Sequence, residues 1–301
     1  MELIPHDCPV CERVTPLQEW AQANWDLAGL GTLAFSSRKS PECMHFHLVR
    51  CGVCDVVFAN PAPSVDWLMA QYRQAAFAAG QESIMAARSY AKVVAALLPD
   101  LGSRDGALDI GAGDGAFLQE LLDLGFSNVA GMEPSQAPID QASATIRPLL
   151  HNQMFTGEEV APASLSLVTC FQTLEHVTRP LELCRKAFNL LRPGGVLLVA
   201  VHNYRAWPAR LMGRRSPIYD IQHLQLFSPL SLGRLLENTG LTRVTIRPLC
   251  NRYPLSYWLR LLPLGITAKR RLLSLLTHVG LENRNLSLCP GNLVAYGFKS
   301  K

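Results

Sequence analysis

The glycine-rich stretch 109–115 constrains the fold of this chain more than any other segment. It reads Asp-Ile-Gly-Ala-Gly-Asp-Gly, it follows the apolar residues 107–108, and an apolar segment at 116–122 comes directly after it. This order predicts a buried strand, a tight turn and the first turns of a helix. A glycine in such a turn lets the backbone come close to a ligand, because it carries no Cβ atom. The stretch therefore predicts a site for a nucleotide-like cofactor.

A second short apolar strand is predicted at 128–133, and it ends in the carboxylate of Glu133. An acid at the tip of the second strand of such a unit is placed to accept hydrogen bonds from both hydroxyls of a ribose. A further strand at 165–171 is followed by Leu-Glu-His at 174–176, and Pro-Gly-Gly at 193–195 leads into another strand. Alternating strands and helices of this kind predict a mostly parallel sheet with helices on both faces.

Taken in this order, the motifs resemble those of the class I S-adenosylmethionine (SAM)-dependent methyltransferases over roughly residues 85–300. The resemblance implies an α/β fold, with a Rossmann-like, doubly wound, seven-stranded sheet whose last strand is antiparallel and inserted in the sheet. We predict its strands near 107–111, 128–133, 148–152, 165–171, 195–202, 242–248 and 291–299. SAM contacts are expected from Asp109, Gly111, Ala112, Gly113, Gly115, Glu133, Pro134, Glu158, Phe171 and Gln172, with Glu158 in the loop that would reach the adenine.

A nicotinamide dinucleotide is the competing cofactor, since Ala116 stands where its fingerprint allows alanine in place of the third glycine. Asp109 argues against it, because a carboxylate before the turn would repel a pyrophosphate but attract the ammonium of SAM's amino-acid part. The Leu-Glu-His and Pro-Gly-Gly motifs are not expected of the dinucleotide-binding folds either. A third interpretation is that the glycines only build a tight turn.

The nine cysteines, an odd number, fit poorly with a purely disulfide-bonded secreted domain. Four of them form two Cys-x-x-Cys pairs, Cys8 with Cys11 and Cys51 with Cys54. Two such pairs complete a tetrahedral site, so we predict a structural Zn²⁺ in a small zinc-ribbon-like module. An empty ribbon or two redox-active pairs are the alternatives. Further candidate ligands are Cys43, His45 and His47, and we interpret Cys170, Cys184, Cys250 and Cys289 as small core residues.

The N-terminal segment resembles a subset of bacterial class I methyltransferases, in which two Cys-x-x-Cys pairs precede a Phe-x-Asn-Pro segment, here 58–61. In those proteins helices after this segment lie over the cofactor pocket. The resemblance would bring Tyr72 to the substrate side, unless it is a core aromatic. We expect the zinc-ribbon-like module at 1–60, a connector with N-terminal helices at 61–100, and a SAM-dependent methyltransferase domain at 101–301 with a helical insertion at about 250–290.

Length and charge limit what else the chain does. Its 301 residues, of which 49% are hydrophobic, suffice for a full core and a small extra domain. The net charge of +4 is too mild to predict an electrostatic grip on nucleic acid. The N-terminus lacks the features of a signal peptide, and no run approaches the roughly 20 apolar residues that span a bilayer, so we expect a cytoplasmic location.

Methyl transfer requires a nucleophile aligned behind the methyl group and, where needed, a base that removes a proton. His176, His202 and His223 are candidates, because a neutral imidazole suits this task near pH 7. We predict catalytic roles for His223, as base or acceptor-orienting residue, and for His176, whose alternative is a helix-start residue bonded to the backbone. The chain here resembles ubiquinone-type O-methyltransferases, in which Glu-x-x-Glu-His can hold a divalent ion. Gln172 replaces the first carboxylate, so we predict no catalytic metal.

Residues 255–279 contain an amphipathic stretch with a basic start. It predicts either a lid over an apolar or lipid-linked acceptor that touches a membrane surface, or a helix that packs its leucine face on the domain. The favoured function is methyl transfer from SAM to a small-molecule acceptor, by a monomer or homodimer that binds no nucleic acid. An RNA methyltransferase that uses the ribbon to bind RNA, and a SAM-binding protein without catalysis, are the alternatives.

Overall fold

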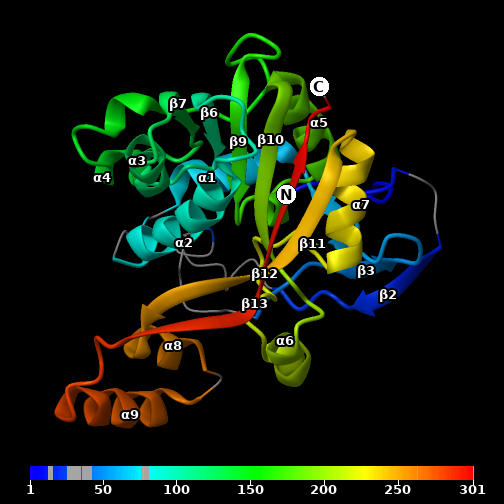
Figure 1. Ribbon diagram of the computed structural model, residues 1–301. Helices are drawn as coiled ribbons and strands as arrows, with labels where there is room; N and C mark the ends of the chain where they lie inside the picture. The colour runs from blue at the N-terminus through cyan, green and yellow to red at the C-terminus, as the bar shows by residue number, and fades with distance from the viewer. Residues whose placement is uncertain are drawn as a thin grey trace.

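The centre of the molecule is a seven-stranded sheet with the order β12-β13-β10-β9-β6-β7-β8 (Figure 1). The computed structural model describes residues 1–12, 16–25, 35, 43–75, 77, 81–262 and 264–300. β13 lies between β10 and β12 and is antiparallel to both, which confirms the predicted fold class. The strands are β6 (Asp105–Ile110), β7 (Ser127–Met132), β8 (Leu150–His151), β9 (Leu165–Phe171), β10 (Leu191–His202), β12 (Thr242–Pro254) and β13 (Asn285–Phe298).

Helices cover both faces of this sheet. The helices of the described part of the chain are α1 (Val65–Gln74), α2 (Gln81–Leu97), α3 (Ala116–Asp123), α4 (Gln136–Gln141), α5 (Pro180–Leu190), α6 (Trp207–Met212), α7 (Pro229–Thr239), α8 (Leu255–Leu261) and α9 (Ile266–His278), with single 3₁₀ turns η2 (Arg147–Leu149), η3 (Leu174–His176) and η4 (Gly213–Arg215). Of these, α8 and α9 lie away from the sheet (Figure 1). Pro180 and Pro229 each open a helix, as their fixed φ favours. The Ser228 side chain caps α7 by accepting from the Ser231 backbone N–H.

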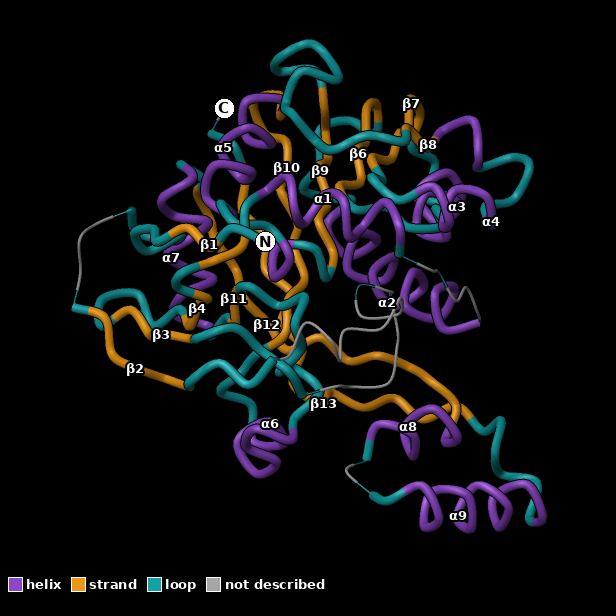
Figure 2. Tube along the Cα trace, turned by 180° about the vertical axis from the view of Figure 1, so that it is seen from behind, coloured by secondary structure: helices purple, strands orange, loops and turns teal. Residues whose placement is uncertain are grey.

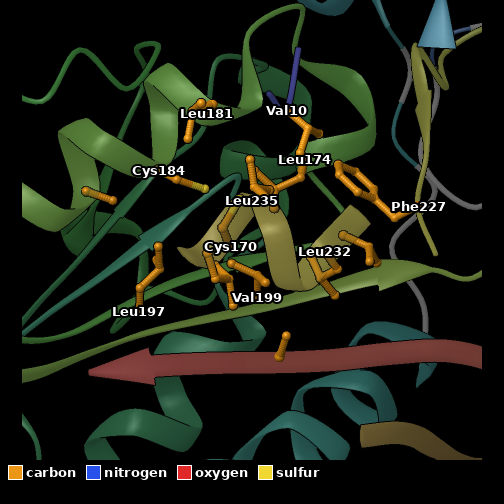
Figure 3. Packing of buried hydrophobic residues seen from close by; sticks show 14 of the residues in the cluster. Val10, Cys170, Leu174, Leu181, Cys184, Leu197, Val199, Phe227, Leu232 and Leu235 are labelled. Atoms are coloured by element: carbon orange, nitrogen blue, oxygen red, sulfur yellow. The ribbon is translucent and has the colours of Figure 1, made fainter. Parts of the chain in front are cut away.

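The central strands are buried on both faces, and successive residues therefore pack into two different cores. On β10, Leu197, Val199 and Val201 pack toward α5 and α7, whereas the alternate residues Val196, Leu198 and Ala200 pack toward α2 and α3. Figure 3 shows the first of these cores, in which side chains of α5 and α7 meet those of β9 and β10. Cys170 and Cys184 lie in it and are fully buried, as predicted.

The N-terminal module packs against the main domain through a shared second sheet. This four-stranded sheet has the order β11-β4-β3-β2, and its edge strand β11 (Gln225–Leu226) comes from the far half of the chain. The module strands are β1 (Leu3–Ile4), β2 (Leu17–Ala21), β3 (Leu48–Cys51), β4 (Val57–Ala59) and β5 (Ala62–Pro63). Val10 of the module joins the core beside α7, where the Asn238 side chain donates to its carbonyl at 3.0 Å (Figure 3). The module is therefore fixed to the domain by backbone pairing and by apolar packing.

β12 and β13 continue beyond the main sheet as a long hairpin that carries α8 and α9 (Figures 1 and 2). We call residues 249–291 the arm. The strands run further than predicted, to Pro254 and from Asn285, so the insertion is part strand and part helix. The prediction that Cys250 and Cys289 are core residues is wrong: both are exposed, and a disulfide joins them across the hairpin. Among the described residues, no helix is long and apolar enough to cross a membrane.

Candidate active site

The glycine turn between β6 and α3 uses its glycines in two ways. Gly111, Gly113 and Gly115 have φ values of +78°, +57° and +71°, where a side chain is strained. A Cβ atom on Gly111 would lie 2.3 Å from Thr173 Oγ1, and one on Gly115 would lie 2.4 Å from Ile146 Cγ2. A Cβ on Gly113 would meet nothing within 4 Å. Two glycines therefore allow close packing, whereas Gly113 faces open space.

That open space is a cavity of about 610 Å³ at the carboxyl ends of β6, β7, β9 and β10. Ligands of open α/β sheets lie at this edge. Of the predicted cofactor residues, those that line the cavity are Asp109, Gly111, Ala112, Gly113, Glu133, Pro134, Phe171 and Gln172. Gly115 packs beneath the turn, and Glu158 is exposed and not among the lining residues. Gln153, Met154 and Phe155 line the cavity instead, and no sequence motif marked them.

Glu133 holds the glycine turn and the start of the next segment together. One carboxylate oxygen accepts from the Gly113 backbone N–H at 2.9 Å, and the other accepts from the Ser135 N–H at 2.9 Å. Burial raises the pKa of Glu133, and the two backbone hydrogen bonds oppose that rise. A carboxylate has about four acceptor positions, so two remain for the hydroxyls of a ribose.

Asp109 is buried at the end of β6 and accepts from Thr169 Oγ1 at 2.6 Å. Burial raises its pKa to about 7, against the lowering effect of the Thr169 hydrogen bond. A cation placed beside this carboxylate would favour its ionised form. The group therefore suits the ammonium end of a ligand better than a phosphate.

The end of β9 supplies an aromatic surface and, in the next residue, an amide without a partner among the described residues. The ring of Phe171 stacks on Tyr90 of α2 with centroids 4.1 Å apart. Gln172 has φ +52°, and both polar atoms of its side chain are buried without a hydrogen-bond partner within the described part of the chain. Because buried amides are nearly always paired, this one indicates a ligand that completes its bonding.

Three imidazoles lie together and line the same cavity. The His223 ring centroid lies 5.1 Å from that of His176 and 5.1 Å from that of His202. Nδ1 of His223 donates to the Ile218 carbonyl at 2.7 Å, because a carbonyl can only accept. His176 Nδ1 lies 3.1 Å from Tyr72 Oη, so Tyr72 lines the cavity beside the imidazoles.

Burial makes two of these imidazoles weak bases. Burial, followed by the nearby His223, lowers the pKa of His176 to about 4. Burial and His202 lower the pKa of His223 as well. Both rings are therefore neutral at pH 7 and can accept a hydrogen bond from a ligand.

Sequence reasoning missed the partner of the third imidazole. Glu175 in η3 is fully buried, and its Oε1 accepts from both Nδ1 (3.0 Å) and the backbone N–H (2.7 Å) of His202. These residues are 27 positions apart, and only the pairing of β9 with β10 brings them together. The Leu-Glu-His motif pointed to Glu175 but not to its contact with His202.

The four predicted zinc ligands form one cluster. Their sulfur atoms all lie within 4.8 Å of one another, with Cys8 Sγ 3.4 Å from Cys54 Sγ and Cys11 Sγ 3.7 Å from Cys51 Sγ. Tetrahedral ligands at a Zn–S distance of about 2.3 Å would stand about 3.8 Å apart, so the spacing fits zinc. His45 and His47 are not part of this cluster, since each bonds a backbone carbonyl through Nδ1.

Comparison with known proteins identifies the family. Residues 82–246 match the sequence profile described as a methyltransferase domain, which is more than half of the chain. The chain belongs to this methyltransferase family. The match spans the glycine turn, Glu133 and all three imidazoles, and it ends before the arm. The protein is a class I SAM-dependent methyltransferase.

Named relatives share this region. The ubiquinone biosynthesis O-methyltransferase of Cupriavidus pinatubonensis is 31% identical over 170 residues, which cover 50% of this chain and 67% of the relative. The enzyme of the same name from Aeromonas salmonicida is 29% identical over 166 residues, which cover 49% and 69%. Among solved structures, a SAM-dependent methyltransferase from Archaeoglobus fulgidus has a TM-score of 0.47 at 14% identity, covering 78% of this chain and 100% of that one.

Proposed function

We propose that this methyltransferase transfers the methyl group of SAM to an oxygen atom of a small-molecule acceptor. The observation that carries the proposal is that the glycine turn, Glu133 and three imidazoles all line one cavity of about 610 Å³. A volume of this size holds the donor together with one small acceptor. The names of the relatives, ubiquinone biosynthesis O-methyltransferases, support oxygen as the nucleophile.

The residues at the donor end fit SAM. Glu133 has acceptor capacity left for the ribose hydroxyls, and Gly113 leaves the space above its backbone free. Asp109 would lie near the ammonium, and the unpaired amide of Gln172 would bond to polar atoms of the donor. When bound, SAM supplies a methyl group already activated by a sulfonium. The protein then has to align the acceptor and exclude water.

The acceptor lies, in this proposal, against the imidazoles. His223 presents its free Nε2, because Nδ1 is committed to the Ile218 carbonyl, and it orients the acceptor hydroxyl. The ring of His176 also contacts His223, and its Nδ1 lies within hydrogen-bond distance of Tyr72 Oη. Both rings accept hydrogen bonds, and burial opposes a positive charge on either one. They therefore serve to position the acceptor hydroxyl.

We further propose that Cys8, Cys11, Cys51 and Cys54 hold one structural zinc ion. The sulfur spacing supports this, and four thiolates leave no open coordination position for catalysis. The ion would keep the two Cys-x-x-Cys turns together beneath the strands of residues 1–60. We propose that this module ends at about residue 60 and that the methyltransferase domain begins at about residue 100.

The arm is proposed to rest on an anionic membrane surface. Residues 255–279 contain four Lys or Arg and no Asp or Glu. Leu272 and Leu275 of α9, and Val279 directly after it, are spaced by three and four residues and are all exposed. Ile266, the first residue of α9, is also exposed, with 78% of its surface free. Tyr257 and Trp258 of α8 line the cavity, so a lipid-linked acceptor could pass from the surface to the imidazoles.

Labelled product identification tests the proposed function. The protein is incubated with methyl-labelled SAM and a cell extract, and the labelled fraction is identified. A labelled small molecule or lipid supports the proposal. Label found in RNA would overturn it in favour of an RNA methyltransferase, and tight SAM binding without any transfer would indicate a non-catalytic SAM-binding protein.

A further inference from the structure

The carboxylate of Glu175 is an unusual group to bury completely. None of its surface is exposed, and within the described part of the chain its carboxylate accepts hydrogen bonds only from the backbone and ring of His202. Oε2 has no hydrogen-bond partner among the residues that the structure describes. An ionised carboxylate in such a place costs several kcal/mol unless a positive or hydrogen-bonding partner offsets it. A neutral His202 therefore stabilises the ionised carboxylate of Glu175 only weakly, whereas a protonated His202 stabilises it strongly.

The contact also fixes which nitrogen of His202 is free. A carboxylate only accepts, so Nδ1 carries the proton, and Nε2 keeps its lone pair. The ring lines the cavity, and 30% of the His202 side chain is exposed. His202 is the last residue of β10, where its backbone is paired with Asn292 of β13. The free nitrogen is thus available at the acceptor end of the cavity.

The three imidazoles differ in the charged and titratable groups that surround them. His202 faces Glu175 and His223, whereas His223 faces the two other imidazoles and Asp220, and His176 faces Tyr72. Burial raises the pKa of Glu175, but the hydrogen bond and charge of His202 outweigh it, so the pKa lies below its usual value. Of the three rings, His202 is the one that the structure shows bonded to the carboxylate of Glu175, within the described residues.

We infer that His202 is the general base of the methyl transfer and that Glu175 is the positioning residue that holds its ring and stabilises its positive form. The inference rests on the proposed function for its substrate. The proton of the acceptor hydroxyl passes to Nε2 of His202, and the oxygen lone pair forms the new O–C bond. The C–S bond breaks with its electron pair going to sulfur, so the positive charge moves from the sulfonium to the imidazolium.

The first test does not need an acceptor. Protein labelled with ¹⁵N-histidine and saturated with S-adenosylhomocysteine is examined by NMR, and the His202 signals are assigned by their loss in His202→Gln. We expect His202 as the Nδ1–H tautomer, because Glu175 accepts from Nδ1. Glu175→Gln should lower the fraction of the Nδ1–H tautomer of His202, because a neutral amide is a weaker acceptor than a carboxylate. The matched control Glu182→Gln, on the exposed face of α5, should leave it unchanged.

An Nε2–H tautomer in the wild-type protein, or an unchanged tautomer fraction in Glu175→Gln, would overturn the inference. Should Glu175→Gln fail to fold, the tautomer of His202 in the wild-type protein still decides. The second test measures the rate of label transfer from methyl-labelled SAM into the cell extract. His202→Gln should lower this rate by about 10²-fold or more at unchanged S-adenosylhomocysteine affinity.

The two proposals fail in different ways. If the wild-type protein transfers no label, the proposed function fails, and the NMR result on the Glu175–His202 pair still stands. If transfer occurs and His202→Gln retains the wild-type rate, the proposed function stands and His202 is not the base.

Discussion

Substitutions at the glycine turn can distinguish a loss of ligand affinity from a loss of folding stability. Gly113 and Gly280 have nearly the same backbone conformation, with φ +57° and +68°, and a Cβ on either would meet nothing within 4 Å. Gly113 faces the cavity, whereas Gly280 follows α9 at the tip of the arm. Replacing either by alanine costs about 1 kcal/mol for the left-handed conformation, and each should lower Tm by roughly 2–4 °C.

The ligand distinguishes the two variants. The new Cβ in Gly113→Ala stands in the space that we assign to SAM, so the affinity for S-adenosylhomocysteine should fall at least tenfold, or about 1.4 kcal/mol. Gly280→Ala should bind like the wild-type protein. Gly111→Ala adds overlap with Thr173 to the backbone strain, so it should lose about 2 kcal/mol or more of folding free energy.

Isothermal titration calorimetry gives the affinities and thermal unfolding gives the stabilities. Wild-type affinity in Gly113→Ala would refute the placement of the donor over this turn. Equal stability of the Gly111 and Gly113 variants would refute the distinction between packing and ligand-facing glycines.

Three further predictions concern charge, metal and membrane. Burial raises the pKa of Asp109 in the folded state to about 7, whereas an aspartate in an unfolded chain has a pKa of roughly 3.9. As pH rises, the unfolded chain therefore releases the Asp109 proton at a lower pH than the folded protein does. The free energy of unfolding of the ligand-free protein should consequently fall as pH rises from about 4 to 7. Asp109→Asn should flatten that dependence in thermal unfolding; an unchanged slope would contradict the assignment. Elemental analysis should find one equivalent of zinc in the wild-type protein and in Cys43→Ser, and none in Cys54→Ser. Zinc retained in Cys54→Ser would disprove the four-cysteine site. Replacing the three basic residues 269–271 by glutamine should weaken co-sedimentation with phosphatidylglycerol vesicles and leave the weak binding to phosphatidylcholine vesicles unchanged. Equal binding of the variant and the wild-type protein to phosphatidylglycerol vesicles would contradict the proposal that the arm binds an anionic membrane.

The motifs predicted the sheet because each marks a strand end. The Asp109 turn and Glu133 close two adjacent parallel strands, and the seven strands with an inserted antiparallel β13 appear as expected. The four cysteines were predictable for the same reason, since each pair occupies one local turn. Local sequence signals were sufficient in both cases.

Contacts between distant segments were not predictable in this way. The two-residue strand β11 leaves no periodic pattern, so the docking of the N-terminal module on it was missed. The Glu175–His202 contact depends on the pairing of β9 with β10 and on a buried charge, neither of which a single sequence displays. The sequence did not predict the Cys250–Cys289 disulfide. Both cysteines have apolar neighbours, which are typical of core residues and do not reveal that a hairpin leaves the main sheet.

The most direct test of the account is a crystal structure of the protein with S-adenosylhomocysteine. We predict one molecule in the cavity, with its ribose hydroxyls on Glu133, its backbone contact at Gly113 and its sulfur directed toward the three imidazoles. Ligand bound elsewhere, or bound with the sulfur turned away from His202 and His223, would contradict the account.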